Sequence, residues 1–260
     1  EAPFPAALDD CIAAFGWAVD QATALGIDPE KIAVGGDSAG GCLAAVVSLH
    51  QRDARRASAT APVPCFQLLI YPVTDKRALA PSHQTNGQGY LLTTESMHYF
   101  RGHYLPNPAD WLDWRASPLL ANDHGDLPPA LVLTAGYDPL RDEGRQYADA
   151  LSAAGTRCQY VCFERQIHGF LPMNKAIGEA DTALALCARA LRQEALADLI
   201  ELRLDRIGHP GKEKLRAFCK AAKKPTQPTA ILKCWPHTKT PSSTIRPPGW
   251  VATPRGTSRW

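Results

Sequence analysis

Three residue types that together can make a hydroxyl group reactive occur far apart in this sequence. Ser38 lies in the pentapeptide GDSAG at positions 36–40, whereas Asp138 and His168 each follow a short apolar segment. A serine hydroxyl is a weak nucleophile near neutral pH, so it needs a base, usually histidine, and a carboxylate that orients the base. The chain order of serine, acid and histidine predicts nucleophilic catalysis through a covalent intermediate.

The surroundings of Ser38 are typical of a sharp turn from a strand into a helix. Glycines stand two positions before and two positions after the serine, where side chains would collide across such a turn. The apolar run 32–34 precedes the turn, and the Ala- and Val-rich segment 42–50 follows it. We therefore expect the N-terminus of a helix, which favours negative charge, to point at the serine.

Strand-like and helix-like segments alternate along most of the chain. Short apolar runs predict buried strands at 32–34, 65–71, 130–135 and 157–163, and apolar residues at helical spacing predict helices at 8–25, 42–50, 141–154 and 176–204. This alternation indicates βαβ units and a parallel sheet, in which ligands gather at the carboxyl ends of the strands. Ser38, Asp138 and His168 all follow such strands, so we expect them to meet at one edge of the sheet.

Other carboxylates and histidines are weaker candidates for the site. Asp142 and Glu143 lie close to Asp138, but we expect them to open the following helix, where carboxylates are favoured. Asp37 precedes the serine and is expected to brace neighbouring loops. Several histidines lie in the irregular, aromatic segment 73–125 and follow no predicted strand: His83, His98, His103 and His124.

Composition and charge set the broad class of the protein. The 260 residues are 45% hydrophobic and 21% charged, which excludes a wholly disordered, collagen-like or coiled-coil chain. No apolar run approaches the ~20 residues that a membrane-spanning helix needs. The net charge of +2 hides a split, since residues 1–200 hold 15 Lys and Arg against 23 Asp and Glu, and residues 201–260 hold 13 against 3. We therefore expect a folded body over 1–205 and a basic, Pro-rich, disordered tail over 206–260.

The eight cysteines are scattered, and none stands in a Cys-x-x-Cys pair. Most lie in apolar runs, so we expect buried thiols in a reducing, cytoplasmic environment rather than a disulfide framework. No group of histidines and cysteines has the spacing of a zinc site. The first residues, EAPFP, lack both a Met and the basic and apolar regions of a signal peptide, so we expect the chain to begin within a longer protein.

Further short motifs surround the three candidate residues. They are GDSAGG at 36–41, YPVTD at 71–75, SPL at 117–119, LPPA at 127–130, DPLRDEG at 138–144 and HGF at 168–170. Over about residues 1–200 these motifs resemble the hormone-sensitive-lipase-like esterases of the α/β-hydrolase superfamily. The resemblance implies a partial catalytic domain over 1–205 that hydrolyses carboxylic esters, with Ser38 as nucleophile, Asp138 as orienting acid and His168 as base. It implies no cofactor and no metal.

The sequence also departs from that family. Members carry a stretch ahead of the region that matches Glu1, with a lid, the first strands of the sheet and a His-Gly-Gly-Gly loop that donates N–H groups to the oxyanion. No such motif occurs here, so the N–H of Ala39, the residue after the nucleophile, is the oxyanion donor that remains. We therefore expect an α/β fold equivalent to the C-terminal part of an α/β hydrolase. It would have a mainly parallel sheet with flanking helices, no lid or first strands, and an open strand edge.

Two functions stay open from the sequence. The first is a serine esterase that acts on short- to medium-chain esters, small-molecule substrates, with aromatic residues of segment 90–114 walling an acyl pocket. The second is a catalytically inactive, truncated hydrolase-like fragment or a binding module, which the missing oxyanion loop favours. Although the tail combines lysines with tryptophans, we expect no nucleic-acid partner and no transmembrane segment. Assembly into a homo-oligomer is left open.

Overall fold

The computed structural model describes residues 2–195, 198–201 and 228–233 of the chain. Within these ranges the strands are β1 (Ile32–Asp37), β2 (Gln67–Ile70), β3 (Ala130–Tyr137), β4 (Cys158–Ile167), β5 (Asp198–Glu201) and β6 (Pro228–Lys233). The α-helices are α1 (Ala6–Asp20), α2 (Ala22–Leu25), α3 (Ala39–Ala57), α4 (Ser82–Thr85), α5 (Thr94–Tyr104), α6 (Arg141–Ala153) and α7 (Gly178–Ala195). Short 3-10 helices occupy Pro29–Lys31, Pro108–Leu112, Pro118–Leu120 and Leu171–Met173.

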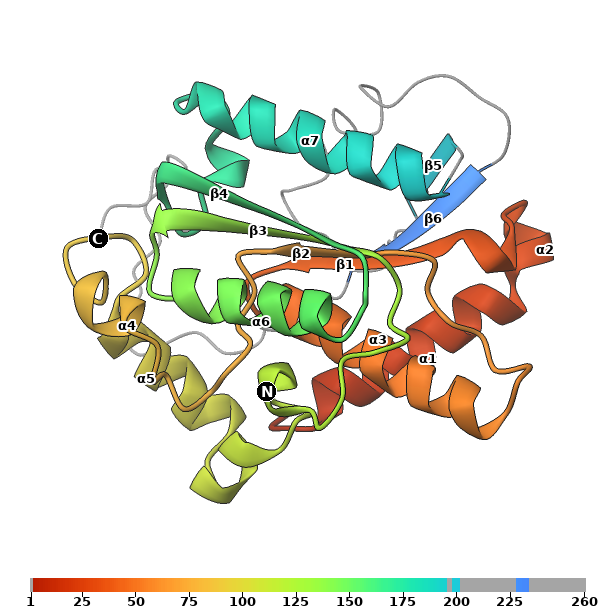
Figure 1. The fold of residues 1–260 in the computed structure, drawn as a ribbon, viewed down its shortest axis with the longest axis horizontal. Helices are drawn as coiled ribbons and strands as arrows, with labels where there is room; N and C mark the ends of the chain where they lie inside the picture. Colours follow the sequence, from red (N-terminus) through yellow and green to blue (C-terminus); the bar gives the residue numbers. More distant parts are fainter. Residues whose placement is uncertain (1, 196–197, 202–227, 234–260) are drawn as a thin grey trace, which may run out of the picture.

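The described strands form one parallel sheet in the order β4-β3-β2-β1-β6-β5. Helices α1, α3 and α6 lie on one side of this sheet and α7 lies on the other (Figure 1). The crossovers from β1 to β2 and from β3 to β4 pass through α3 and α6, because parallel neighbours cannot be joined by a tight hairpin. The parallel sheet with flanking helices that the sequence predicts is therefore confirmed.

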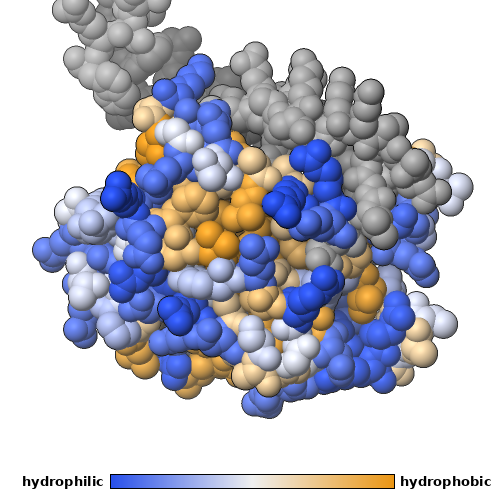
Figure 2. Space-filling view, turned by 45° about the horizontal axis from the view of Figure 1, so that its top comes forward, coloured by the Kyte–Doolittle hydropathy of each residue, from blue (hydrophilic) through white to orange (hydrophobic). Residues whose placement is uncertain are grey.

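Alternation along the strands divides the core into two clusters, one on each face of the sheet. One set of buried strand residues packs with α1, α3 and α6: Ile32, Val34, Leu69, Ala130 and Val132. Their neighbours in sequence pack with α7: Ala33, Leu68, Leu131, Leu133 and Ala135. Because both faces are covered, β1, β2 and β3 are buried and largely apolar, whereas β4 at the edge of the sheet is only partly buried and includes polar residues. On the α7 side, apolar residues also gather in the middle of the surface and hydrophilic residues surround them (Figure 2).

The outer edge of β1 differs from the expectation of an open strand edge. Strand β6 pairs with β1 there, with Ile32 beside Ala230 and Gly35 beside Lys233. An unpaired edge leaves backbone N–H and C=O groups without partners, so the addition of a strand is favourable. Apart from β6, the tail predicted over 206–260 lies outside the described residues, as does the predicted boundary at 205. The division into a body and a tail therefore stays a prediction.

Two helical segments also differ from the pattern-based expectation. The helix predicted over 176–204 ends at Ala195, and the residues of β5 pair with β6 instead, so hydrogen bonds between strands replace those of a helix. Helix α5 lies within the segment predicted to be irregular. It begins with a capping box in which Thr93 and Ser96 each accept a hydrogen bond from the other's N–H. Helix α5 buries none of its residues, and its short apolar pattern of Met97, Phe100 and Tyr104 does not stand out from the aromatic segment around it.

The expectation of buried thiols holds for three of the six described cysteines, since Cys65, Cys158 and Cys162 are only partly buried. Cys11, Cys42 and Cys187 are buried, and no disulfide joins the cysteines that the structure describes. Burial raises the pKa of the Cys187 thiol to about 12, because the thiolate loses its hydration there. Cys219 and Cys234 lie outside the described residues. Among the described helices, none has the length and apolar character to cross a membrane.

Candidate active site

Ser38 stands at the junction of β1 and α3 in a backbone conformation that few side chains adopt. Its φ is 56° and its ψ is −117°, a strained combination that persists only where the surroundings hold it. The Ser38 N–H donates to the carbonyl of Ile70 at 2.9 Å, and the Ser38 carbonyl accepts from the N–H groups of Cys42 and Val73 at 3.2 and 3.3 Å. These bonds anchor the turn, so the hydroxyl is presented at the carboxyl end of β1.

Close backbone approaches require the glycines around this turn. A Cβ on Gly36 would lie 2.3 Å from the carbonyl carbon of Gly40, and a Cβ on Gly41 would lie 2.9 Å from the Cβ of Pro72. Neither distance leaves room for a side-chain atom, and the neighbour of Gly36 is main chain that cannot rotate away. The sequence-based explanation, a collision across the turn, is therefore confirmed for Gly36.

Asp138 follows β3 and is fully buried. Just before it, the register between β3 and β4 shifts between Ala135 and Tyr137, which marks a bulge. Bulges bend a strand and redirect the residues that follow. The Asp138 Oδ1 atom accepts a hydrogen bond from the Leu140 N–H at 2.8 Å, so Oδ2 remains for a second partner.

That partner is His168, in the turn after β4. Its Nδ1 atom lies 2.7 Å from Asp138 Oδ2, and its Nε2 atom lies 3.0 Å from Ser38 Oγ. Because an ionised carboxylate only accepts, Nδ1 carries the ring proton and Nε2 can accept from the hydroxyl. The His168 ring also packs on the ring of Tyr71, with centroids 4.7 Å apart. The structure thus brings the three predicted side chains together from the ends of three strands.

The electrostatics of this cluster suit the transfer of a proton from Ser38 to His168. An imidazole that gains the proton becomes positive, and the buried Asp138 carboxylate beside it would stabilise that charge. Burial, together with the nearby carboxylates, raises the pKa of Tyr71, so its phenol stays neutral against the His168 ring. Ala39 is the first residue of α3, where N–H groups have no acceptor within the helix. Its N–H therefore suits a negatively charged oxygen.

Neither rival acid occupies the place beside His168. Asp142 accepts a hydrogen bond from the Ser82 N–H at 2.9 Å. Glu143 is fully buried, and it accepts from the N–H groups of Thr74 and Asp75 at 2.7 and 3.2 Å. Both acids lie in the first turn of α6, as expected, but the hydrogen bonds of Glu143 go to the loop after β2 rather than to the start of the helix.

The buried histidines of segment 73–125 have hydrogen-bond partners outside the triad. His83 is buried, and its Nε2 atom lies 2.5 Å from Glu143 Oε2. His124 is also buried, and its Nε2 atom lies 3.0 Å from a backbone carbonyl. Burial lowers the pKa of His124, which favours its neutral form. His98 and His103 are exposed on α5. The pairing of His83 with Glu143 has no signal in the sequence, because the two lie 60 residues apart.

The aromatic segment expected to wall an acyl pocket divides into two parts. On α5, Tyr99 and Phe100 are 64% and 61% exposed and pack against each other. The loop before α5 approaches the triad, since Leu91 Cδ2 lies 3.5 Å from the position that a Cβ on Gly169 would take. Gly169 directly follows His168, so this loop borders the candidate site. The acyl-pocket role of the segment stays a prediction.

Sequence reasoning did not single out several residues around the triad. Tyr71 supports the His168 ring, and only its place in the motif YPVTD hinted at a role. Ser82 and Asn86 contact the turn of Asp138 from a segment expected to be irregular. Within the ranges that the structure describes, no group of three or more His, Cys, Asp or Glu side chains is arranged to hold a metal ion.

A parallel sheet with a strained serine between a strand and a helix defines an α/β protein with a nucleophile-elbow turn. A family model described as alpha/beta hydrolase fold matches residues 1–172. The chain belongs to this alpha/beta hydrolase family. The match confirms the superfamily that the motifs indicate.

Several proteins similar to this chain are ester hydrolases by name. The chain is 44% identical over 190 residues to an ethyl acetate hydrolase of Pseudomonas putida, and the aligned region covers 73% of this chain and 58% of that protein. The chain is 47% identical over 173 residues to the carboxylic ester hydrolase LipN of Mycobacterium tuberculosis, and the aligned region covers 66% of this chain and 46% of that protein. The solved structure of EstE1, a thermostable carboxylesterase from a metagenomic library, matches with a TM-score of 0.70 at 44% identity, over 75% of this chain and 65% of that chain. The chain thus spans about half to three-fifths of the length of these two curated relatives.

Proposed function

We propose that this chain carries the active site of a carboxylic-ester hydrolase. Ser38 is the nucleophile, His168 is the base and Asp138 is the acid that orients the base. The observation that carries the proposal is the continuous hydrogen-bond chain from Asp138 Oδ2 through His168 to Ser38 Oγ, with distances of 2.7 and 3.0 Å. The names of the relatives, which are ester hydrolases, support the reaction class.

The mechanism proceeds through an acyl-enzyme. Ser38 Oγ attacks the ester carbonyl carbon while its proton moves to His168 Nε2, and the resulting oxyanion faces the Ala39 N–H at the start of α3. Collapse of this intermediate breaks the bond to the alcohol oxygen, which leaves with the proton from Nε2. Water then attacks the acyl group with His168 as base, which releases the carboxylic acid and restores Ser38.

The proposed substrates are small esters with short to medium acyl chains. The name of the Pseudomonas putida relative, an ethyl acetate hydrolase, supports a short ester. We also propose a cytoplasmic location, because the scattered cysteines suit a reducing compartment. Whether copies of the chain assemble is left to measurement by light scattering.

Labelling with a fluorophosphonate probe tests this function, because the probe reacts with an activated serine. We expect the 260-residue chain to be labelled at Ser38 and to hydrolyse a short-chain aryl ester. Ser38→Ala should abolish both signals. Ser152→Ala is the matched control, since it removes a hydroxyl that bonds only to a carbonyl of its own helix, α6. A well-folded wild-type chain that is neither labelled nor active would leave the inactive fragment or binding module as the better explanation.

A further inference from the structure

The turn that carries Asp138 is held from outside by helix α4 and the residue after it. Ser82 Oγ donates to the Pro139 carbonyl at 2.6 Å, and Asn86 Nδ2 lies 3.1 and 3.2 Å from the carbonyls of Gly136 and Asp138. Ser82 is fully buried and Asn86 is 6% exposed, so water does not readily replace these bonds. Three carbonyls in and just before this turn thus accept from two side chains of another segment, although Arg141 also donates to the carbonyls of Gly136 and Asp138.

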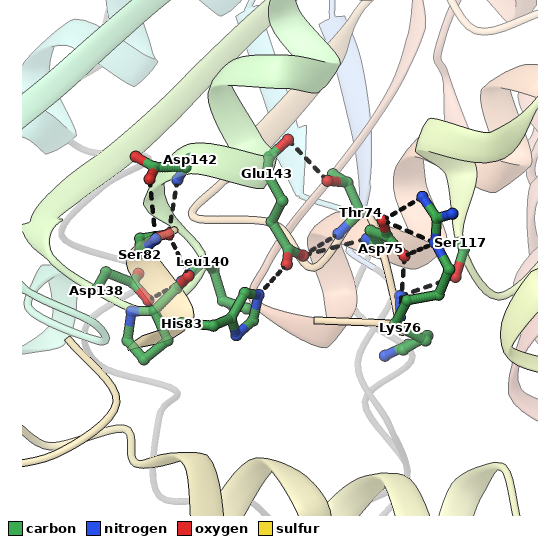
Figure 3. Close-up of polar contacts among 12 residues, drawn as sticks. Thr74, Asp75, Lys76, Ser82, His83, Ser117, Asp138, Leu140, Asp142 and Glu143 are labelled. Atoms are coloured by element: carbon green, nitrogen blue, oxygen red, sulfur yellow. Dashed lines mark hydrogen bonds and ion pairs between the residues drawn. The ribbon is translucent and has the colours of Figure 1, made fainter. Parts of the chain in front are cut away.

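A buried acid–imidazole pair outside the triad fixes α4 in turn. Figure 3 shows Glu143 reaching from α6 toward His83 on α4 and toward the loop that contains Thr74 and Asp75. The Glu143 carboxylate shares a 2.5 Å hydrogen bond with His83 Nε2, and Thr74 Oγ1 donates to the Glu143 carbonyl at 2.8 Å. A helix of four residues is too short to be stable by itself, so these contacts set where α4 lies.

This network reaches the triad through the main chain of the turn. Strand β3 ends at Tyr137, so the strand ladder does not hold the residues that follow. Asn86 and Ser82 supply donors to the turn at that point. A displacement of about 1 Å in a reacting group can lower a rate by about 10²-fold. Small movements of the turn would therefore change how Asp138 meets His168.

We propose that Asn86 and Ser82, held by the His83–Glu143 pair, are positioning residues that keep the Asp138 carboxylate aligned with His168. The inference rests on the proposed function, because alignment affects a rate only if Asp138 orients a working base. The competing explanation is a purely structural network, which would stabilise the fold and leave the triad unaffected.

The test compares Asn86→Ala with Gln84→Ala in the 260-residue chain. Both remove a side-chain amide from the same short segment, but Gln84 is exposed. We expect Asn86→Ala to lower kcat for a short-chain aryl ester by about 10- to 100-fold with little change in KM, because the lost contacts act on orientation and not on substrate binding. Gln84→Ala should stay within about two-fold of wild type.

A second readout follows the hydrogen bond itself. A proton on His168 Nδ1 that bonds to Asp138 should give a strongly downfield proton NMR signal in the wild type and in Gln84→Ala. The signal should weaken or move upfield in Asn86→Ala. A folded Asn86→Ala with unchanged kcat and unchanged signal would overturn the proposal. If Asn86→Ala does not fold, Ser82→Ala decides by the same two measurements, with a drop of several-fold expected.

The two measurements separate this inference from the proposed function. A wild-type chain that hydrolyses no ester and takes up no probe refutes the proposed function, but the NMR comparison still tests the positioning of Asp138. Conversely, an active wild type with an unaffected Asn86→Ala and Ser82→Ala refutes the positioning inference alone.

Discussion

Asp138→Asn offers the sharpest test of the triad, because one side chain makes two different hydrogen bonds. Its Oδ1 accepts from the Leu140 N–H at 2.8 Å, and its Oδ2 accepts from His168 Nδ1 at 2.7 Å. An asparagine has one oxygen and one NH2 group, so it cannot replace both acceptors. If the oxygen stays on Leu140, the amide donates to Nδ1 and drives the ring proton to Nε2. The ring can then no longer accept the Ser38 proton.

The opposite orientation keeps the productive tautomer but is unfavourable. The NH2 group then faces the Leu140 N–H inside the protein, and an unsatisfied buried donor costs about 1–3 kcal/mol, or about 5- to 150-fold in population. Loss of the negative charge beside the imidazolium removes roughly another 2 kcal/mol, about 30-fold. Together these effects predict a loss of about 10²- to 10⁴-fold, whose upper end matches the loss known for the equivalent change in serine proteases.

The assay is the second-order rate of fluorophosphonate labelling at Ser38, together with kcat/KM for a short-chain aryl ester. Asp149→Asn is the control, because it makes the same chemical change at an exposed residue whose ion pair with Arg145 lies on α6. Circular dichroism verifies that both variants fold. A loss smaller than about ten-fold in Asp138→Asn would refute the assignment of Asp138 as the orienting acid.

Three further predictions concern stability and reactivity. Gly36→Ala should lower the free energy of unfolding by about 3 kcal/mol or more, because the new Cβ would lie 2.3 Å from main-chain atoms. The control is Gly16→Ala in α1, where a Cβ would have nothing within 4 Å. In the same urea titration this control should raise the free energy of unfolding by about 0.5–1 kcal/mol. Burial raises the pKa of Glu143, so the folded state binds this proton more tightly than the unfolded state. The protonated carboxyl therefore contributes to the stability of the fold at low pH, and this contribution is lost as the pH rises through the folded pKa. The stability of Glu143→Gln relative to wild type should therefore improve from acid toward neutral pH in urea titrations, and a trend of the opposite sign would contradict the burial effect. Burial raises the pKa of Cys158 and of Cys187 to about 12, so few of these thiols are ionised at pH 8. Mass spectrometry should therefore find both thiols poorly alkylated in the folded chain and fully alkylated in urea. Equal alkylation rates in the folded and unfolded states would contradict this prediction.

The sequence determined the parts of this protein that depend on local patterns. Four apolar runs specified β1 to β4. The strands β1 to β3 are covered on both faces and are therefore largely apolar, whereas β4 at the sheet edge is only partly buried. The GDSAG pentapeptide specified the turn of Ser38, because its geometry excludes side chains at Gly36. The position of Asp138 and His168 after predicted strands was enough to place them at one edge of a parallel sheet.

Only the tertiary structure decided which groups meet within hydrogen-bond distance. The bulge between β3 and β4 and the contacts of α4 determine how Asp138 reaches His168, and neither leaves a pattern in the sequence. The pairing of Glu143 with His83 likewise joins residues 60 positions apart. Such contacts depend on strand register and on how loops pack, which are collective properties of the folded chain. Local residue types can indicate which chemistry is available, but the three-dimensional packing sets the distances on which that chemistry depends.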